Sequence, residues 1–223
     1  MNTRVAEGSA PAHPRRAVPG LLARPTARTM PWLPLVLAGA AAVLLAATQD
    51  RDRLLVLRLD EVILAVGAAF LLDDPTEETL AHVPTSLLRR RAVRVALAVP
   101  LLSLAWWQAL AVAPAGAAFE TPVPGWPLTL EIAALVAWAL ALSAGLSRWV
   151  PERFGGVVAG PTLAVLVALS VLLPERLRLW VSPEEPLWHH AHRLWAVALT
   201  IGVALFVWWS RDPWRRRWVR RPP

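Results

Sequence analysis

The sequence predicts an all-α polytopic integral membrane protein with six transmembrane helices and both termini in the cytoplasm. Of its 223 residues, 56% are hydrophobic and only 17% are charged, a balance that soluble domains do not show. Six apolar stretches approach the roughly 17 to 25 residues that a helix needs to cross the hydrocarbon core. The arginines gather in alternate connecting segments, as expected when such loops stay in the cytoplasm.

The six stretches divide the chain into a transmembrane domain, residues 31–210, and two basic tails, residues 1–30 and 211–223. The stretches are residues 32–48, 54–72, 95–113, 128–146, 156–173 and 194–209. Residues 1–30 contain four prolines and five arginines without a hydrophobic period, so we expect a disordered cytoplasmic tail. An alternative is that the first stretch belongs to a cleaved secretory signal, although its proline-rich leader is long for one.

The arginine positions predict the orientation. With the N-terminus inside, the four cytoplasmic segments 1–30, 73–94, 147–155 and 211–223 hold 17 of the 23 arginines. Cytoplasmic loops keep such an excess, so both termini are predicted inside a bacterial cytoplasmic membrane. Trp214 and Trp218 stand among the arginines of the C-terminal tail, a composition that suits contact with anionic lipids.

Missing residue types exclude several chemistries. All 23 basic residues are arginine, so the chain lacks the lysine of a GxxxxGK[ST] phosphate-binding loop and cannot hydrolyse ATP in that way. Without cysteine, it forms no disulfide, thiolate nucleophile or cysteine-ligated metal centre. We therefore expect no enzyme activity, no cofactor and no metal site in this chain.

The second stretch carries a candidate polar pathway: Arg58, Asp60 and Glu61. A charge that faces lipid near mid-membrane costs about 2.5 to 3.5 kcal/mol on insertion scales. Arg58 and Glu61 are three residues apart and could pair on one helical face, which would reduce that cost. Either these residues line a pathway or subunit interface, or the helix is shifted outward and they lie among the headgroups.

The loop between the second and third stretches is a candidate docking site. Asp74-Pro75, followed by Glu77, is a start signal for a short helix that runs to about residue 82. Thr85 or Ser86 can then cap a helix that begins at Leu87. The loop pairs an acidic with a basic surface, and the alternative is an ordinary solvated loop. Its candidate contact residues are Asp73, Asp74, Glu77, Glu78, Arg89, Arg90 and Arg91.

The connection 174–192 is too apolar for a simple loop, and we expect two short helices at the outer interface. Its His189, His190 and His192 raise the alternative of a metal or haem site, which we disfavour because no cysteine assists. Three milder features lie in the other stretches: Glu131, expected at shallow depth; Gln108, a helix-linking amide; and a GxxxG pair, Gly156 and Gly160.

These features resemble the membrane-spanning subunit of a type-2 ABC exporter, in particular the small Ala- and Arg-rich permease-like proteins of actinobacteria. The resemblance covers the layout of residues 32–209: six spans, the amphipathic segment 85–94, the capped Asp74-Pro75 turn and the apolar outer insertion 174–192. In place of the family's amphipathic helix before the first span stands the basic tail, in which residues 18–22 would supply a remnant.

The resemblance implies a permease that exports a substrate with energy from a separate ATP-binding cassette subunit. That subunit would hold ATP and Mg²⁺ and contact the loop 73–91, and a second permease copy or homologue would complete the pathway. We expect membrane lipids as further partners and no nucleic acid. Two alternatives stay open: a non-transporting scaffold or accessory subunit of an envelope complex, and a histidine-based metal or haem membrane protein.

Overall fold

The computed structural model describes residues 18–48, 53–73, 86–112, 124–149 and 154–211. Within these ranges the chain folds into seven α-helices and two 3-10 turns, with no strand. The elements are α1 (Val18–Thr29), α2 (Trp32–Thr48), α3 (Arg53–Ala69), η1 (Phe70–Leu72), α5 (Leu87–Val112), α6 (Gly125–Leu146), α7 (Gly155–Ser170), η3 (Glu175–Leu177) and α8 (Trp188–Trp209). The all-α prediction is confirmed for the described residues.

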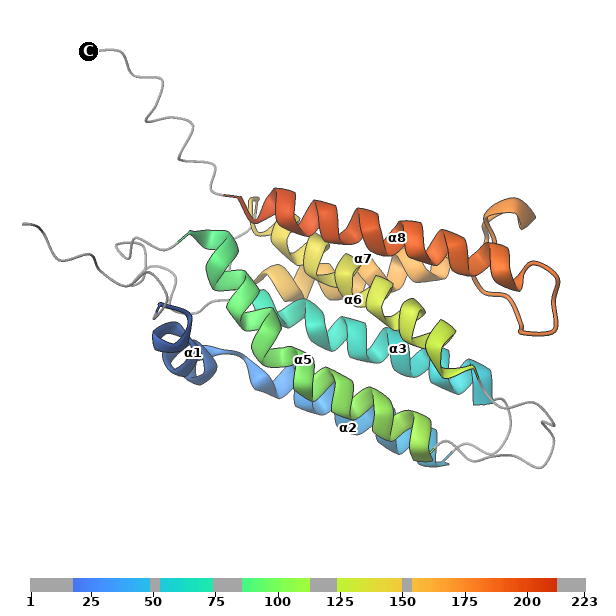
Figure 1. Ribbon diagram of the computed structural model, residues 1–223, viewed down its shortest axis with the longest axis horizontal. Helices are drawn as coiled ribbons and strands as arrows, with labels where there is room; N and C mark the ends of the chain where they lie inside the picture. The colour runs from blue at the N-terminus through green and yellow to red at the C-terminus, as the bar shows by residue number, and fades with distance from the viewer. Residues whose placement is uncertain (1–17, 49–52, 74–85, 113–123, 150–153, 212–223) are drawn as a thin grey trace, which may run out of the picture.

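Six helices, α2, α3, α5, α6, α7 and α8, form one elongated bundle in which successive helices run in opposite directions (Figure 1). Each coincides with one of the six predicted apolar stretches, but α5 and α8 begin earlier, at Leu87 and Trp188. We call the end where α3, α6 and α8 begin the outer end, after the side on which the arginines place it. The opposite end is the inner end.

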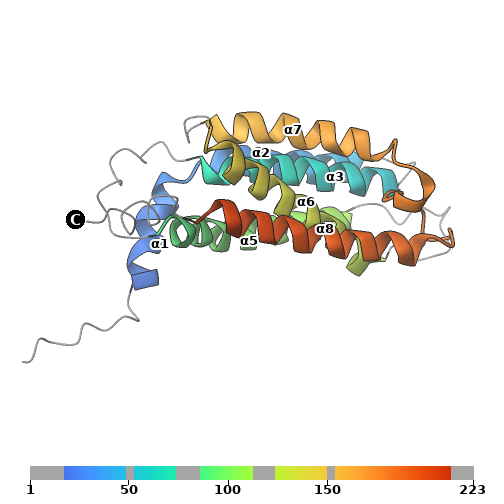
Figure 2. The ribbon, with the colours of Figure 1, turned by 90° about the horizontal axis from the view of Figure 1, so that it is seen from above.

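Helix α6 lies at the centre of the bundle. It packs against α3, α7 and α8, and Figure 2 shows α7 and α8 on opposite sides of it. Leu128, Ala134 and Ala141 on this helix are completely buried. Helices α2 and α5 pack against each other. Helix α2 also packs against α3, which packs against α6 and so connects this pair to the centre of the bundle. An interior position for α6 explains why its side chains contribute to all three hydrophobic clusters of the core.

Glycines allow the closest helix contacts. A Cβ atom on Gly67 would lie 2.5 Å from the Ala38 Cβ on α2. A Cβ on Gly156 would lie 2.7 Å from the Phe70 Cα, and one on Gly160 would lie 3.3 Å from the Val66 side chain. The GxxxG pair therefore provides the surface on which α7 packs against α3 and η1, as its spacing predicts.

The outside of the bundle is apolar, as expected for a protein that faces lipid. Large hydrophobic side chains such as Leu37, Leu104 and Val165 are more than half exposed along its length. By length and composition, α5, α6 and α8 can each cross a membrane, and the bent pair α1–α2 makes a fourth candidate. These helices fit a membrane protein.

Helix α1 differs from the expectation of a disordered tail over residues 1–30. Val18–Thr29 is helical, and its final part, Ala23–Thr29, is bent by 71° against α2. The Trp32 indole N–H donates to the Ala27 carbonyl oxygen at 2.6 Å, which fixes the bend. Helix α1 packs against α5 across the inner end (Figure 1). Residues 1–17 and 212–223 lie outside the described residues.

Two further expectations were wrong. The connection between α7 and α8 contains one 3-10 turn, Glu175–Leu177, followed by turns, and not two short helices. Pro183 and Pro186 each remove a backbone N–H there, which disfavours a helix, whereas the residues from Trp188 onward extend α8. The Gln108 side chain is exposed on α5 and makes no hydrogen bond to another helix among the described residues, so it does not link two helices within this chain.

Candidate functional site

Two groups of buried or partly buried polar side chains lie at opposite ends of the bundle. The outer cluster comprises Arg58, Asp60 and Glu61 of α3, Glu131 of α6 and His192 of α8. The inner cluster comprises Asp73 after η1, Arg91 and Arg94 of α5, Ser147 after α6 and Ser210 after α8. Charged side chains are costly to bury unless partners compensate them, so both clusters are candidate sites.

An ion pair between α3 and α6 forms the centre of the outer cluster. Arg58 donates to both carboxylate oxygens of Glu131, with Nε 3.1 Å from Oε2 and Nη2 3.3 Å from Oε1. Nη2 also donates to the Val181 carbonyl oxygen at 2.6 Å. The guanidinium carbon lies 5.5 Å from the centre of the Trp180 ring, within cation–π distance. Arg58 thus joins α3 to α6 and to the segment that connects α7 and α8.

His192 brings α8 to the same carboxylate. Its Nε2 lies 3.2 Å from Glu131 Oε1, an ion-pair contact whose angle falls outside hydrogen-bond geometry. Its Nδ1 lies 2.9 Å from the Trp188 carbonyl oxygen. The imidazole ring also contacts the Trp188 indole, with 4.1 Å between the ring centres. Glu131 is therefore shared by a cation on α3 and an imidazole on α8.

Asp60 and Glu61 have no such partners. Both side chains are completely buried, and none of their four carboxylate oxygens has a hydrogen bond among the described residues. The charges of Glu131, Arg58 and Asp60 act on Glu61, so Glu61 belongs electrostatically to the cluster. The expected pairing of Arg58 with Glu61 is therefore replaced by the pairing with Glu131, because Glu131 faces the guanidinium with both oxygens.

The inner cluster includes residues that precede and follow the segment 74–85, which itself lies outside the described residues. At its start, the Asp73 carboxylate accepts the Gly156 backbone N–H at 2.7 Å. Beyond its end, Arg94 donates to the Asp73 carbonyl oxygen at 2.9 Å, and Arg91 donates to the Ser147 hydroxyl at 2.7 Å. Arg91 also lies 3.5 Å from the Ser210 hydroxyl. These bonds join η1, α5, α6, α7 and α8 at one end of the bundle.

Burial acts on the Asp73 carboxyl group, which follows the last residue of η1. Its pKa is raised to about 6, chiefly because burial disfavours the charged form. The Gly156 N–H and the Arg94 guanidinium favour the charged form and partly offset this shift. Asp73 is therefore placed to change its charge at mildly acidic pH while it retains a hydrogen bond to α7.

The candidate docking residues have different environments. Arg89 is exposed and Arg90 is partly buried, whereas Arg91 and Asp73 are directed into the bundle as parts of the inner cluster. Asp74, Glu77 and Glu78 lie outside the described residues, as does the short helix expected after Pro75. Of the four candidate contact residues that the structure describes, Arg89 is thus the exposed one.

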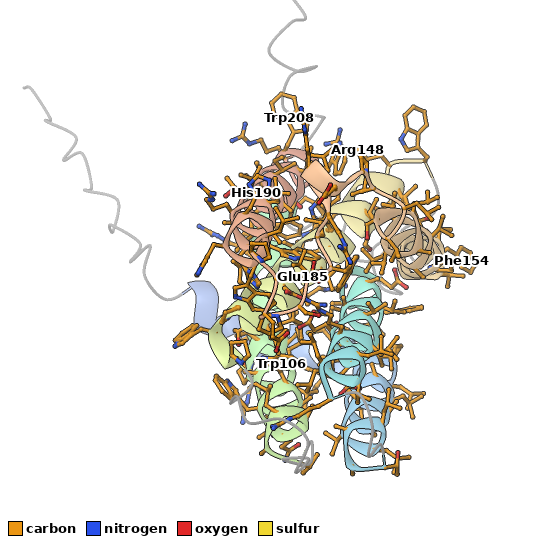
Figure 3. The ribbon with its side chains drawn as sticks, turned by 90° about the vertical axis from the view of Figure 1, so that its right-hand side faces the viewer. Trp106, Arg148, Phe154, Glu185, His190 and Trp208 are labelled. Carbon is orange, nitrogen blue, oxygen red and sulfur yellow. The ribbon has the colours of Figure 1, made fainter. Side chains whose placement is uncertain are left out.

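The three outer histidines are not gathered around a common point. His190 lies 3.0 Å from the Arg176 carbonyl oxygen, His189 is exposed, and His192 faces Glu131. Figure 3 looks onto this end of the bundle and labels Glu185, on the segment before α8, and His190, at the start of α8. Within the described ranges, no group of three or more His, Asp or Glu side chains is arranged to hold a metal ion.

Sequence reasoning did not find the role of Glu131, which it placed at shallow depth. A usable signal existed: Arg58 and Glu131 each lie about one and a half turns from the outer start of their helices. Two helices that begin at the same end bring such residues to equal depth, and a lone carboxylate in an apolar helix needs a partner. His192 was harder to place because α8 was expected to begin after it.

Two apolar grooves lie beside the central helix. One, of about 480 Å³, runs between α5 and α8 and includes Val99, Val136 and Val203 in its wall. The other, of about 260 Å³, lies between α6, α7 and α8 and includes Trp138 and Trp180. Neither groove is lined by Arg58, Asp60 or Glu61, so these residues face the interior of the bundle and not a described groove.

Comparisons with protein-family models, curated proteins and solved structures found no match to this chain. Any statement about its function therefore depends on its own residues and geometry.

Proposed function

We propose that this chain is the membrane-spanning permease subunit of an ABC-type exporter in the bacterial cytoplasmic membrane. In this proposal, α2, α3, α5, α6, α7 and α8 are its six spans, and both termini lie in the cytoplasm. A separate ATP-binding cassette subunit hydrolyses ATP and acts on the segment 73–91. A second permease copy or homologue completes the pathway, whose polar residues include Arg58, Asp60 and Glu61.

The observation that carries the proposal is the set of hydrogen bonds made by the residues on either side of the segment 74–85. Asp73 before it is bonded to α7, and Arg91 after it is bonded to the ends of α6 and α8. A partner that displaces this segment would therefore act on several helices at once. Such an anchor suits a loop that transmits force, whereas a passive connection does not need it.

Helix α1 provides further support. It lies across the inner end, is bent by 71° against α2, and packs against α5, which follows the proposed coupling segment. The type-2 exporters that the sequence resembles have an amphipathic helix in this place before the first span, and α1 occupies the corresponding position here. Because α1 contacts α5, a movement at the segment 74–85 would also reach α2 through the bend.

The test is to purify the tagged full-length chain from membranes of its own host in mild detergent. We expect an ATP-binding cassette subunit to co-purify in a fixed ratio and the complex to hydrolyse ATP. Replacing exposed Arg89 by Glu should reduce the recovered ATPase subunit, because the variant reverses a charge on the proposed contact surface without touching the inner cluster.

The matched control is Arg176→Glu, which reverses an exposed arginine at the opposite end of the molecule and should leave recovery of the ATPase subunit unchanged. A folded, purified chain that never brings an ATPase subunit with it would overturn the proposal and favour the scaffold alternative. Equal loss with Arg89→Glu and Arg176→Glu would overturn the assignment of the segment 73–91 as the contact.

A further inference from the structure

The outer cluster has an unbalanced charge. Three carboxylates, Asp60, Glu61 and Glu131, are completely buried, and the guanidinium of Arg58 is the one permanent cation of the cluster. If every carboxyl group were ionised and His192 neutral, two negative charges would be uncompensated. A buried carboxylate without a hydrogen bond is costly and becomes neutral when a proton is accessible. Glu61 meets this condition with both of its oxygens.

The surroundings of His192 also favour an added proton. Its Nδ1 faces the Trp188 carbonyl oxygen at 2.9 Å, and its Nε2 faces Glu131 Oε1 at 3.2 Å. Both neighbours are acceptors, but a neutral imidazole has a single N–H. Only the protonated ring carries a hydrogen on both nitrogens, and its contact with Glu131 is then an ion pair. His192 is 14% exposed, whereas Glu131 is completely buried, so the ring reaches the exterior while the carboxylate does not.

From this arrangement we infer that the outer cluster is a proton-binding site, in which Glu61 stores the proton and His192 exchanges it with the outside. His192 is the member of the cluster that is both partly exposed and in direct contact with one of the buried carboxylates, Glu131. The reaction is the conversion of a carboxylate and a proton from water into a carboxylic acid, and no electron transfer is involved. The inference goes beyond the permease proposal and does not depend on it.

Other charged side chains that the structure describes at this end lie outside the cluster. Arg178 pairs with Glu185 on the segment between α7 and α8, at 3.3 Å. Arg53 donates to the Leu110 carbonyl oxygen at 3.2 Å, and Arg193 is exposed on α8. Helices α2 and α7 contain no charged residue. The charged groups that act on Glu61 are Asp60 on its own helix, Glu131 on α6 and the Arg58 guanidinium.

The storage role is tested by infrared spectroscopy on the purified full-length protein in lipid nanodiscs. A protonated carboxyl group has a C=O stretch that is resolved from the amide bands. We expect this band in the wild type at neutral pH, its largest loss in Glu61→Gln, and its full retention in Glu185→Gln, whose carboxylate lies on the surface. A wild type without the band, or an unchanged band in Glu61→Gln, overturns the inference.

Asp60→Asn keeps the storage test decisive even if Glu61→Gln does not fold. Asp60 is the second buried carboxyl group without a partner, but the charge of Glu131 acts on Glu61 and not on Asp60, so the Asp60 variant should lose the smaller part of the band. Loss of most of the band in Asp60→Asn would contradict storage at Glu61.

The exchange role is tested by the rate at which the same band shifts after transfer into D₂O. We expect His192→Gln to slow the shift by about tenfold or more, since a positioned proton-transfer group commonly contributes about 100-fold. His189→Gln is the matched control, because His189 is exposed near the start of the same helix and should leave the rate unchanged. Equal rates in wild type and His192→Gln would show that the proton takes another route.

Discussion

At the scale of single residues, Asp73 illustrates opposing influences on one group. Burial raises the pKa of its carboxyl group to about 6, above the usual 3.8, while the Gly156 N–H and Arg94 partly stabilise the charged form. The folded chain therefore holds this proton to higher pH than the unfolded chain does. Where the folded state binds more protons, the free energy of unfolding decreases as pH rises. The affected window lies between about pH 4 and pH 6.

We predict that Asp73→Asn removes a pH dependence of stability. In the wild type, the free energy of unfolding should fall by up to about 3 kcal/mol as pH rises through this window, because one pKa unit corresponds to about 1.4 kcal/mol. The asparagine side chain keeps an acceptor for the Gly156 N–H but does not ionise in this range. Denaturant unfolding in detergent at several pH values measures the slope.

Glu184→Gln is the control for Asp73→Asn, since Glu184 is exposed on the segment between α7 and α8. It should keep the slope of the wild type. A slope that persists in Asp73→Asn would show that another group titrates with folding.

The residues of the outer cluster show which features of a buried site can be predicted from the sequence. The charges of Arg58, Asp60 and Glu61 stand out in an apolar stretch, so their candidate role was visible from composition alone. The partner of Arg58 was not, because the nearest opposite charge in sequence, Glu61, lies three residues away, whereas Glu131 approaches only through the packing of α3 against α6. Partners across helices depend on depth and rotation, which local spacing does not determine.

At the scale of elements, the close contact of α7 with α3 and η1 depends on Gly156. A Cβ atom there would lie 2.7 Å from the Phe70 Cα and 2.8 Å from two atoms of its ring. The Phe70 backbone cannot move aside without shifting the helix, so the helices must separate. Gly125, at the start of α6, has no atom within 4 Å of its ideal Cβ position and provides a matched comparison.

We predict that Gly156→Ala destabilises the protein by about 1 to 3 kcal/mol, the usual range for an overpacked interior. Gly125→Ala should be neutral or stabilise slightly, because alanine has less backbone freedom to lose on folding. Thermal unfolding of the two variants side by side in the same detergent measures the difference. Equal melting temperatures for both variants would contradict the close approach of α7 to η1.

Helices with a strong apolar pattern could be predicted from the sequence, whereas a helix with a weak apolar pattern could not. The stretch 32–48 coincides with α2, since an uninterrupted apolar run has clear limits. Helix α1 was missed because Pro25 and its polar neighbours weaken the period, while the contact with α5 and the Trp32 bond that stabilise it are tertiary. Helix α8 begins before the predicted span because its first turns are polar. A prediction from hydropathy alone detects the apolar part of a helix and leaves such polar turns out.

At the scale of the whole molecule, the alternation of six helices makes a prediction about sides. Ser86 and Arg211 lie at the inner end, at the start of α5 and the end of α8. Gly125 and Glu184 lie at the outer end, at the start of α6 and in the segment before α8. If all six helices span the membrane and the arginine distribution sets the orientation, these two pairs are on opposite sides.

The absence of cysteine allows a direct test of this topology, because each single-cysteine variant carries one reactive thiol. We predict that a membrane-impermeant maleimide labels Gly125→Cys and Glu184→Cys in intact spheroplasts. Ser86→Cys and Arg211→Cys should be labelled only after the membrane is permeabilised. Labelling of all four variants from one side would mean that the bundle does not span as proposed, and the reverse pattern would place both termini outside. Either result would remove the cytoplasmic position that the proposed ATPase contact requires.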